Sequence, residues 1–489
     1  MKTKLLLVAC GLVAVLGNPA FSQDTPQKNT KVWTLKECVD YALANNLGVQ
    51  RSRYDVESAE VTRLQSKAAM LPSVNASVSN GYNWGRSINP VTNEFTTQEI
   101  RSLSPNANAQ LTVFNGLRIQ NTIRQSNKDF QASEQDLEKA KNDLMLNVIN
   151  LYVNVVFNKE LLENARFQLS SSQQQYERTK KQVEAGALPK SNELNLDAQV
   201  ATNEVAVVNN ENALNLSLLQ LKQALQLPGS TDMDVEIPQL EVEDLVIENS
   251  SQEIFEIARK SLPEIRAAEL RVSSSYYAVK AARGNLYPRL TLGGSLNSNY
   301  SSANDRPIPI EGAVETVPSP IGYYIDPVSS QQRFVFRDVE MPTAFTDGYG
   351  YRDQLSDNFF RSAGITLSIP LLNGFQSRAQ VQRSVINRNV AEINHKLANQ
   401  TLRQNVETAY NDAFAASKTY NSSIRQVQAR EEAFRMTKQR FDIGAANYVE
   451  YQVAENDLFQ AKSDLARAKY NFIFRKKLLD FYSGKPLDF

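Results

Sequence analysis

The residues that most often carry catalysis or bind metals are scarce in this chain. Its 489 residues include one histidine, His395, and two cysteines, Cys10 and Cys38. A zinc site needs several closely placed ligands, and a serine or cysteine nucleophile needs a histidine beside it. His395 has no cysteine or second histidine near it in the sequence, so we interpret it as a solvated helix position. We predict no metal site, no cofactor and no enzymatic activity.

The charge balance argues against a nucleic-acid-binding protein. The chain has 53 basic and 53 acidic side chains and a formal net charge of zero, whereas nucleic-acid binding leaves a basic footprint. Hydrophobic residues make up 42% of the chain and charged residues 22%, with a mean hydropathy of −0.41. No run of about 20 apolar residues follows the N-terminus, so no transmembrane helix is expected.

The first 22 residues have the features of a signal peptide. A basic N-terminus precedes an apolar core over residues 5–16 and a small-residue cleavage site that ends at Ser22. Lipidation of Cys10 is the alternative, although the apolar stretch before it is short for such a signal. Without residues 1–22, Cys38 is the only cysteine, and we expect it to be a small buried residue. An exported chain without a disulfide indicates a bacterial envelope protein.

The remaining sequence is a tandem duplication. The Asn-Gly pairs that end at Gly116 and Gly374 lie 258 positions apart, and so do Gly186 and Gly444. Nearer the start of each copy, Leu71-Pro72 and Tyr287-Pro288 lie 216 positions apart, so the second copy carries 42 extra residues. We assign residues 23–227 and 251–489 to the two repeats. Residues 228–250 between them carry seven acidic side chains and no basic one, and we interpret them as a linker or a small solvated layer.

Each copy follows one plan of helix, strand, strand, long helix, tight turn and helix. The first helix, about residues 34–70, has a capping-box pattern in Thr34 and Glu37. Alternating apolar and polar residues predict strands at about 72–84 and 105–115, and again at 288–299 and 360–370. We expect the second copy's excess, within about 300–360, to be a surface loop.

The long helices exceed those of an ordinary globular domain. Residues 116–184 contain no proline and predict about 100 Å of helix. Their apolar seam, spaced by four, three, four and seven, is typical of a coiled coil; it comprises Leu144, Val148, Leu151, Val155 and Leu162. The glycine turns at 185–190 and 443–448, which we call the first and second tip turns, lead into helices about half as long. The first and last helices of a copy would together match the long one.

The strands constrain the assembly. They have the length that crosses an outer membrane, yet four strands cannot close into a barrel and open edges are not tolerated in lipid. Three chains would supply twelve strands. The alternative is a periplasmic structural or tethering coiled-coil protein with a small peripheral hairpin. A third hypothesis is an envelope hydrolase, but the sequence offers only Asp/Glu pairs and no recognisable catalytic site for it.

This duplicated plan, with Asn-Gly after the second strand and a glycine at each tip, resembles the TolC-type outer membrane factors of Gram-negative bacteria. The resemblance covers nearly the whole mature chain. It implies a mainly α fold with a small β part. It also implies a homotrimer that builds a twelve-stranded β-barrel in the outer membrane on a long α-helical barrel in the periplasm.

The resemblance also implies a function. Such proteins are exit ducts of tripartite efflux or type I secretion systems, and they conduct substrates passively from an inner-membrane pump, of RND or ABC type, through a periplasmic adaptor. The tip turns then form the gated entrance and the adaptor site. The adaptor-facing residues implied are Gly186, Leu188, Ser191, Gly444, Ala445 and Val449.

The entrance residues expected here are Asp442, Gly444 and Glu450. The family places carboxylates around its entrance, six and nine residues after the glycine of the second tip turn. Glu450 matches a family carboxylate, whereas Val453 replaces a second one. The hydroxyl and arginine that latch family members closed are missing at Phe441 and Ala446, although Arg440 is adjacent. Two plainer interpretations stay open: each tip glycine is a helix cap, and Glu450 is a favourable charge at a helix N-terminus.

Overall fold

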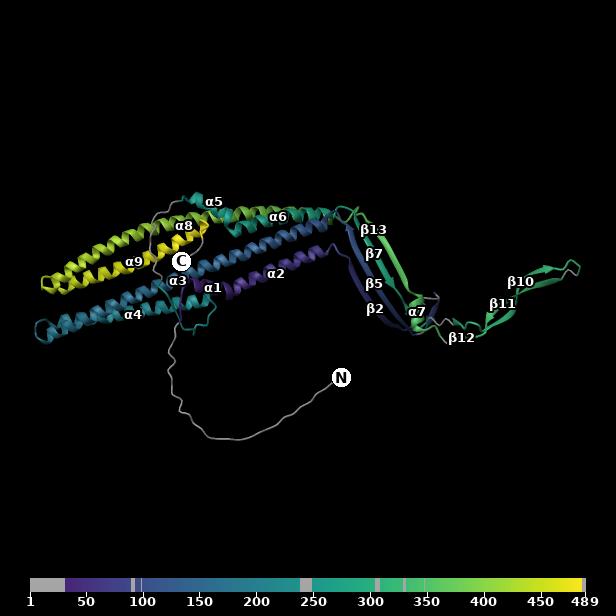
Figure 1. Cartoon of the computed structure of the whole chain (residues 1–489), viewed down its shortest axis with the longest axis horizontal. Helices are drawn as coiled ribbons and strands as arrows, with labels where there is room; N and C mark the ends of the chain where they lie inside the picture. The colour runs from purple at the N-terminus through teal and green to yellow at the C-terminus, as the bar shows by residue number, and fades with distance from the viewer. Residues whose placement is uncertain are drawn as a thin grey trace, which may run out of the picture.

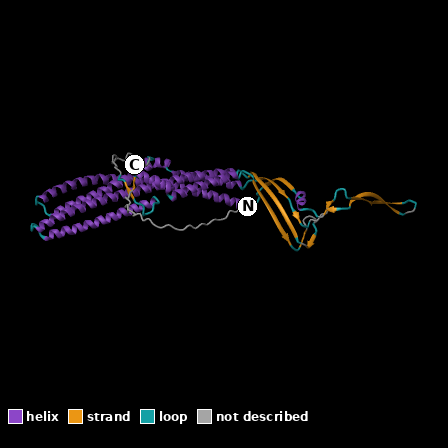
Figure 2. Cartoon of the chain, turned by 60° about the horizontal axis from the view of Figure 1, so that its bottom comes forward, coloured by secondary structure: helices purple, strands orange, loops and turns teal. Residues whose placement is uncertain are grey.

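The molecule is long and narrow, with its helices at one end and its strands at the other (Figures 1 and 2). A computed structural model describes residues 31–88, 93–97, 99–237, 249–303, 308–328, 331–346 and 348–485. The expected signal peptide with Cys10 and much of the acidic linker lie outside these ranges. Within them, no helix is long and apolar enough to cross a membrane.

Every helix at the helical end has a partner of equal length in the other copy. Helices α3 and α8 have 67 residues, α4 and α9 have 35, α2 and α6 have 22, and α1 and α5 have 11. This equality agrees with the predicted duplication. Their bounds are α1 Leu35–Asn45, α2 Leu47–Ala68, α3 Arg118–Glu184, α4 Lys190–Ala224, α5 Ser251–Ser261, α6 Pro263–Gly284, α8 Gln376–Asp442 and α9 Tyr448–Tyr482.

The first helix of each copy is broken, whereas the sequence predicted one continuous helix over 34–70. The capping box is confirmed, because the Glu37 N–H donates to Thr34 Oγ1 (3.2 Å) and the Thr34 N–H to Glu37 Oε2 (3.0 Å). At Asn46 the backbone turns to the extended region, and the side chain accepts from the Gly48 N–H at 2.8 Å. Pro263 begins α6 in the equivalent way. Asparagine and proline both favour a helix start, which explains a break at each position.

The long helix α3 organises the helical end. It packs against α2 and α6 on the sheet side and against α4 on the tip side, while α8 packs against α6 and α9. The predicted seam is buried at Val148, Val155 and Leu162. Cys38 is fully buried beside it, as expected, and burial raises the pKa of its thiol to about 12.

Part of the predicted linker is ordered as a strand. Strand β6 (Met233–Val235) pairs in parallel with β1 (Lys31–Trp33) against α3. The hydroxyl of Tyr152 donates to the Glu236 carbonyl at 2.7 Å and lies 3.2 Å from the Trp33 carbonyl. Lys159 Nζ binds both oxygens of Asp234 at 2.8 Å. The start of the acidic segment is therefore anchored to α3.

The four predicted strands form one antiparallel sheet in the order β13-β7-β5-β2. They are β2 (Ser73–Asn83), β5 (Ile100–Phe114), β7 (Arg289–Asn297) and β13 (Phe360–Ser368), and the short β8 (Tyr300–Ser301) also pairs with β5. In the described part of the chain, no strand pairs with the outer edge of β2 or β13. The sheet is therefore open at both sides.

The excess of the second copy, which was expected to be a surface loop, is largely regular structure. It contains a long hairpin of β10 (Val314–Ile325) and β11 (Gln332–Pro342), which extends away from the sheet (Figure 1). The shorter elements are β9 (Ile308–Pro309), β12 (Phe345–Thr346) and α7 (Tyr351–Asp357); β3 (Arg86–Ile88) and β4 (Phe95–Thr97) pair in the first copy. Runs of aromatic and β-branched residues between the prolines favour strands, and the prediction gave the prolines too much weight.

We expect Tyr152→Phe to destabilise the helical end. The change removes the donor that the Trp33 and Glu236 carbonyls share, at a cost of about 1–2 kcal/mol for a buried hydrogen-bonding group. The measurement is the thermal unfolding midpoint of the purified protein in detergent. Tyr54→Phe, at a position 66% exposed, is the matched control. Equal midpoints for the two variants would contradict the role of Tyr152.

Candidate functional site

The sheet has one polar face. Side chains on all four strands are hydrogen bonded there, either to a neighbouring strand or along their own strand. The Asn106 amide donates to Ser77 Oγ (2.7 Å), Asn297 donates to Ser295 Oγ (3.1 Å), and Ser295 and Ser362 share a bond of 2.7 Å. This band of uncharged side chains runs from one open edge to the other and suits contact with water.

The opposite face of the same sheet is apolar except near its end away from the helices, where Arg361 pairs with Leu296. Val74 and Ile365, on the two edge strands, are 68% and 72% exposed. Among the described residues, no helix packs extensively against this face. Each large side chain left in water therefore forgoes about 1.5–3 kcal/mol of burial free energy. A sheet with one wet face and one bare apolar face suits a boundary between water and lipid. The apolar face comprises Val74, Ala76, Val78, Ala107, Ala109, Leu111, Leu290, Leu292, Leu296, Ala363, Ile365 and Leu367.

The two tip turns, at the far end of the molecule, share one backbone structure. Gly186 and Gly444 have φ values of +75° and +74°. In the first tip turn the Ala187 N–H donates to the Gln182 carbonyl (2.8 Å), and in the second the Ala445 N–H donates to the Arg440 carbonyl (2.7 Å). This is the Schellman helix ending, in which glycine takes the left-handed position. Both glycines are therefore helix caps, and a contact role is compatible with that.

Glu450 lies at the start of α9 within a small polar network. Its N–H donates to Asn447 Oδ1 (2.9 Å), and its carboxylate accepts from Asn447 Nδ2 (3.0 Å). Arg440 Nη2 lies 3.4 Å from Glu450 Oε2 and also donates to the Ala445 carbonyl at 3.2 Å. Arg440, which the sequence suggested only as a neighbour of the missing latch, therefore ties the two arms of the second tip turn together.

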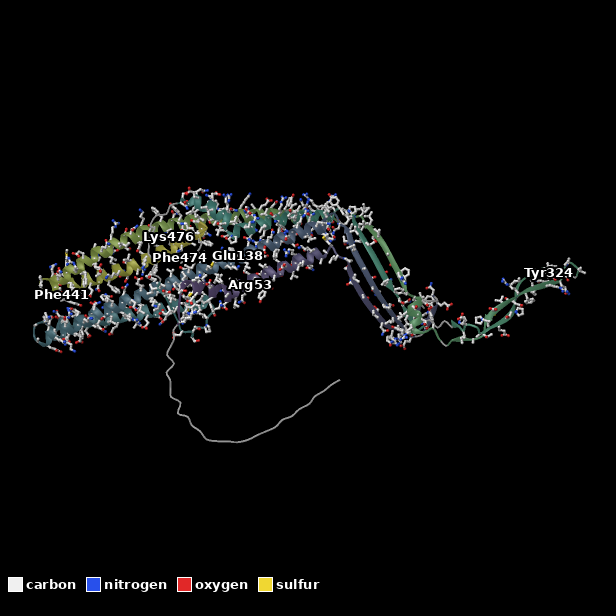
Figure 3. All side chains as sticks on the ribbon, in the orientation of Figure 1. Arg53, Glu138, Tyr324, Phe441, Phe474 and Lys476 are labelled. Atoms are coloured by element: carbon white, nitrogen blue, oxygen red, sulfur yellow. The ribbon has the colours of Figure 1, made fainter. Side chains whose placement is uncertain are left out.

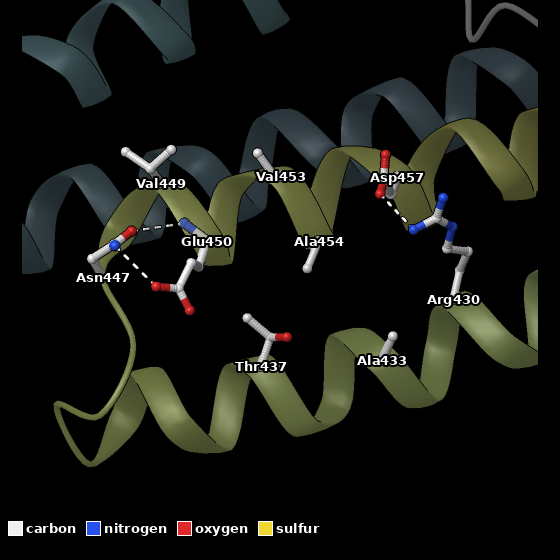
Figure 4. Close-up of a pocket in the computed structure, with 9 residues that line it drawn as sticks. All are labelled: Arg430, Ala433, Thr437, Asn447, Val449, Glu450, Val453, Ala454 and Asp457. Carbon is white, nitrogen blue, oxygen red and sulfur yellow. Dashed lines mark hydrogen bonds and ion pairs between the residues drawn. The ribbon is translucent and has the colours of Figure 1, made fainter.

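The predicted entrance residues are divided between two clefts. Asp442 and Gly444 line a cleft of about 550 Å³ between the two tip turns, which Leu188 also reaches. Glu450 and Val449 line a separate groove of about 450 Å³ between α8 and α9 (Figure 4). Gly186, Ser191 and Ala445 are exposed and line neither. The structure thus brings Leu188 to Asp442 but does not place Asp442 and Glu450 in one site.

The groove of Figure 4 has charged walls at one end and apolar walls in its middle. Arg430 on α8 and Asp457 on α9 form an ion pair of 2.6 Å. Between this pair and Glu450 the walls are the small side chains of Ala433 and Ala454. Small residues let another helix approach closely, so the groove suits a helical partner.

An aromatic cluster at the second tip turn was missed by the sequence analysis. The ring of Tyr451 lies 5.5 Å from Phe434 and 5.0 Å from Phe441, and Phe441 lies 6.4 Å from Tyr448. Figure 3 labels Phe441 at this end of the molecule. Burial, with Glu455 nearby, raises the pKa of Tyr448 to about 12, so its hydroxyl stays protonated. The seven-residue spacing of positions 434, 441 and 448 was the available signal.

The first tip turn has charged residues in place of Tyr448 and Tyr451. Positions 190 and 193 correspond to Tyr448 and Tyr451, and there Lys190 Nζ pairs with Glu193 Oε1 at 2.6 Å. Between the tip hairpins, Ser171 Oγ donates to Glu455 Oε1 (2.6 Å) and Gln168 donates to Asn456 (3.0 Å). The two copies therefore share a backbone at the tips while presenting different chemistry.

The remaining candidate residue has an ordinary setting. His395 is half-buried on α8, and its Nε2 lies 3.1 Å from the side-chain nitrogen of Asn399. Among the described residues, no group of three or more His, Cys, Asp and Glu side chains is placed to hold a metal ion.

The chain is similar to known envelope proteins over most of its length. A family model described as "Outer membrane efflux protein" matches residues 38–226 and 254–484. Nodulation protein T of Rhizobium leguminosarum bv. viciae is 23% identical over 435 residues, 89% of this chain and 78% of that protein. The alkaline protease secretion protein AprF of Pseudomonas aeruginosa is 20% identical over 91% of this chain and 82% of its own. The crystal structure of the outer membrane protein VceC of Vibrio cholerae superposes with a TM-score of 0.70 at 15% identity, covering 93% of this chain and 97% of VceC.

We expect the tip glycines to be needed for their backbone conformation rather than for space. A Cβ at Gly186 or Gly444 would meet no atom within 4 Å, so Gly444→Ala costs only the left-handed strain of about 1 kcal/mol. Hydrogen exchange of the Ala445 amide should accelerate about fivefold. Gly444→Asn is the control with a smaller effect, because asparagine tolerates this conformation. Identical exchange in the alanine variant and the parent would contradict this assignment.

Proposed function

The chain belongs to the outer membrane efflux protein family, and on this premise we propose that it is the exit duct of a tripartite efflux or type I secretion system. The observation that carries the proposal is the two-faced sheet with two open edges. Its apolar face suits outer-membrane lipid, and its polar face suits a water-filled lumen. The helices then extend into the periplasm.

Closure of the sheet requires further copies of the chain. Neighbouring strands are antiparallel throughout the order β2, β5, β7 and β13, so β13 and β2 run in opposite directions. Strand β13 of one chain can therefore pair with β2 of the next and continue the antiparallel pattern. Two chains would give eight strands, whose interior side chains fill. Three chains give twelve strands, which is the smallest multiple of four that leaves a passage.

The helices would continue the passage from the membrane toward the inner membrane. Helices α3 and α8 have 67 residues each, about 100 Å at 1.5 Å per residue. Three chains would arrange six such helices, with their partners, around one axis. No step in this role consumes a substrate, so the energy has to come from an inner-membrane pump of RND or ABC type. We propose that a periplasmic adaptor joins this pump to the tip turns.

The tip turns offer the adaptor two different surfaces. The groove between α8 and α9 has small side chains in its middle and an ion pair at one end, which suits an adaptor's helical hairpin. The residues proposed for contact are Gly186, Leu188, Ser191, Gly444, Ala445 and Val449, all of them exposed except the half-buried Leu188. Arg440, which bridges the arms of the second tip turn, is a candidate for holding the entrance closed.

A tethering coiled coil is the second candidate, favoured by the long helices and their narrow seam. The two candidates differ in one measurable property. Purified duct inserted into a planar lipid bilayer should give stepwise ionic conductance, because the polar face lines an aqueous passage. A tether should come off cells without detergent and leave the bilayer resistance unchanged. Absence of conductance from correctly inserted protein would overturn the duct.

The charge at the entrance should set ion selectivity. A ring of Glu450 carboxylates in a narrow passage attracts cations, and Arg440 opposes it from 3.4 Å away. In a salt gradient, Glu450→Gln should shift the reversal potential toward lower cation selectivity, and Arg440→Gln should shift it the other way. Glu163→Gln, at an exposed site about 30 Å along α3 from the tip, is the control. An unchanged reversal potential in Glu450→Gln would count against a gate at this residue.

The proposed adaptor surface predicts a loss of export without a loss of assembly. Ala445→Asp places a charge on an exposed position of the second tip turn, where it would be buried against an adaptor at an uncompensated desolvation cost. Cells that carry the variant should be as sensitive to exported toxic compounds as cells without the protein. The trimer mass in detergent should match the parent. Full resistance in these cells would argue against adaptor contact at this turn.

A further inference from the structure

The hairpin of β10 and β11 extends beyond the sheet, at the opposite end from the tip turns (Figure 1). Its strands pair from Val314 with Pro342 out to Ile325 with Gln332. Neither strand packs extensively against any other described element of the chain. If the tips face the periplasm, this hairpin lies outside the cell.

The two faces of the outer half of this hairpin differ in chemistry. A register shift between Pro320 and Gly322 sets the pairing, which places Tyr323 opposite Phe334 and Pro320 opposite Phe336. The Phe334 ring lies 6.4 Å from Tyr323 and 6.5 Å from Phe336. This aromatic face, defined as Pro320, Tyr323, Ile325, Phe334 and Phe336, carries no charge. The other face carries Arg333 and Arg337 beside Tyr324 and Val335.

The aromatic face is too apolar to be stable in water. Tyr323 is 62% exposed, and Ile325, Phe334 and Phe336 are exposed to a similar degree. Together these four side chains present roughly 450 Å² of surface, if each offers about 150–250 Å² when fully exposed. An exposed patch of that size marks an interaction surface, and a two-stranded hairpin alone is marginally stable in water.

The place where the hairpin leaves the sheet indicates what covers this face. The hairpin lies in the chain between β7 and β13, and β13 is an open edge that the proposed trimer pairs with a neighbouring chain. Each hairpin therefore emerges beside a seam between two chains, and the other two hairpins emerge from the same end of the assembly. An uncharged patch that occurs three times around one axis is complementary to its own copies.

We propose that the aromatic faces of the three hairpins pack on one another above the outer mouth of the barrel and form an apolar collar around the threefold axis. The inference rests on the proposed trimeric duct. Asp338 and Glu340 lie on the same face but nearer the sheet, where like charges from three chains repel. The hairpins are accordingly apart at their bases and in contact at their outer halves.

Adjacent tyrosines provide a matched pair of test sites. Tyr323 lies on the aromatic face and Tyr324 on the opposite face, and both are at least half exposed; Figure 3 labels Tyr324 near the end of the hairpin. Cys38 is fully buried, so the parent chain supplies a background without cross-links. Phe336 and Arg337 give a second adjacent pair on the two faces, in case one substitution impairs folding.

The experiment is oxidation of Tyr323→Cys and Tyr324→Cys in isolated outer membranes, followed by non-reducing electrophoresis. Tyr323→Cys should give a covalent dimer of the chain with about tenfold higher yield than Tyr324→Cys, because packing raises the effective concentration of its thiols. Equal yields at the two sites, or none at Tyr323→Cys, would overturn the collar. A cross-link to a protein of another mass would also overturn it and assign the face to a different partner.

Molar mass in detergent distinguishes a failure of the proposed collar from a failure of the proposed trimeric duct. Light scattering of the same unoxidised variants reports the oligomer directly. A trimer without the Tyr323→Cys cross-link refutes the collar and leaves the duct intact. A monomer refutes the duct itself.

Discussion

Unpaired backbone groups at the edges of a sheet cannot exist in lipid, and the rest of this structure depends on that constraint. Each N–H or carbonyl left without a partner in a bilayer costs several kcal/mol. The sheet is apolar on one face, so it suits lipid, yet β2 and β13 are both open. Strands from other copies of the chain can supply hydrogen-bond partners for both edges, and each added copy leaves the same two edges to be paired. The proposed trimer, the passage along its axis and the ring of tip turns all follow from closing this one sheet.

Duplication lets one chain serve two positions around such a ring. The paired helices have equal lengths, and the two tip turns have the same Schellman geometry, so the copies are interchangeable as a scaffold. Their side chains have diverged: the second tip turn has an aromatic cluster where the first has the Lys190–Glu193 ion pair. A ring built from both kinds of tip presents alternating surfaces to its partners. The backbone that the two copies share thus determines assembly, whereas the side chains that differ between them determine which partner each tip turn contacts.

Much of the fold was predictable because long periodic patterns leave few alternatives. All four strands of the sheet, the bounds of α3 and the two tip turns were predicted from period-2 alternation, an uninterrupted seam and two glycines. The breaks before α2 and α6 were missed, because the helix cap at Asn46 ends a helix without changing the periodic pattern of apolar and polar residues. The strands β10 and β11 within the expected surface loop were not predicted, because their prolines lie in a ribbon with solvent on both sides, where a missing N–H costs little. The site was only partly predictable: Asp442 and Glu450 are close in sequence, yet they line different clefts.

The number of chains that close the sheet decides whether this protein can form a duct. The most direct test is the molar mass, by light scattering after size exclusion in mild detergent, of protein extracted from outer membranes. One full-length chain has a mass of 54.8 kDa, and the account predicts a particle of three mature chains once the detergent is subtracted. A monomer or dimer that stays in solution without detergent would contradict it, because the edges of β2 and β13 would then have no partner to close a barrel.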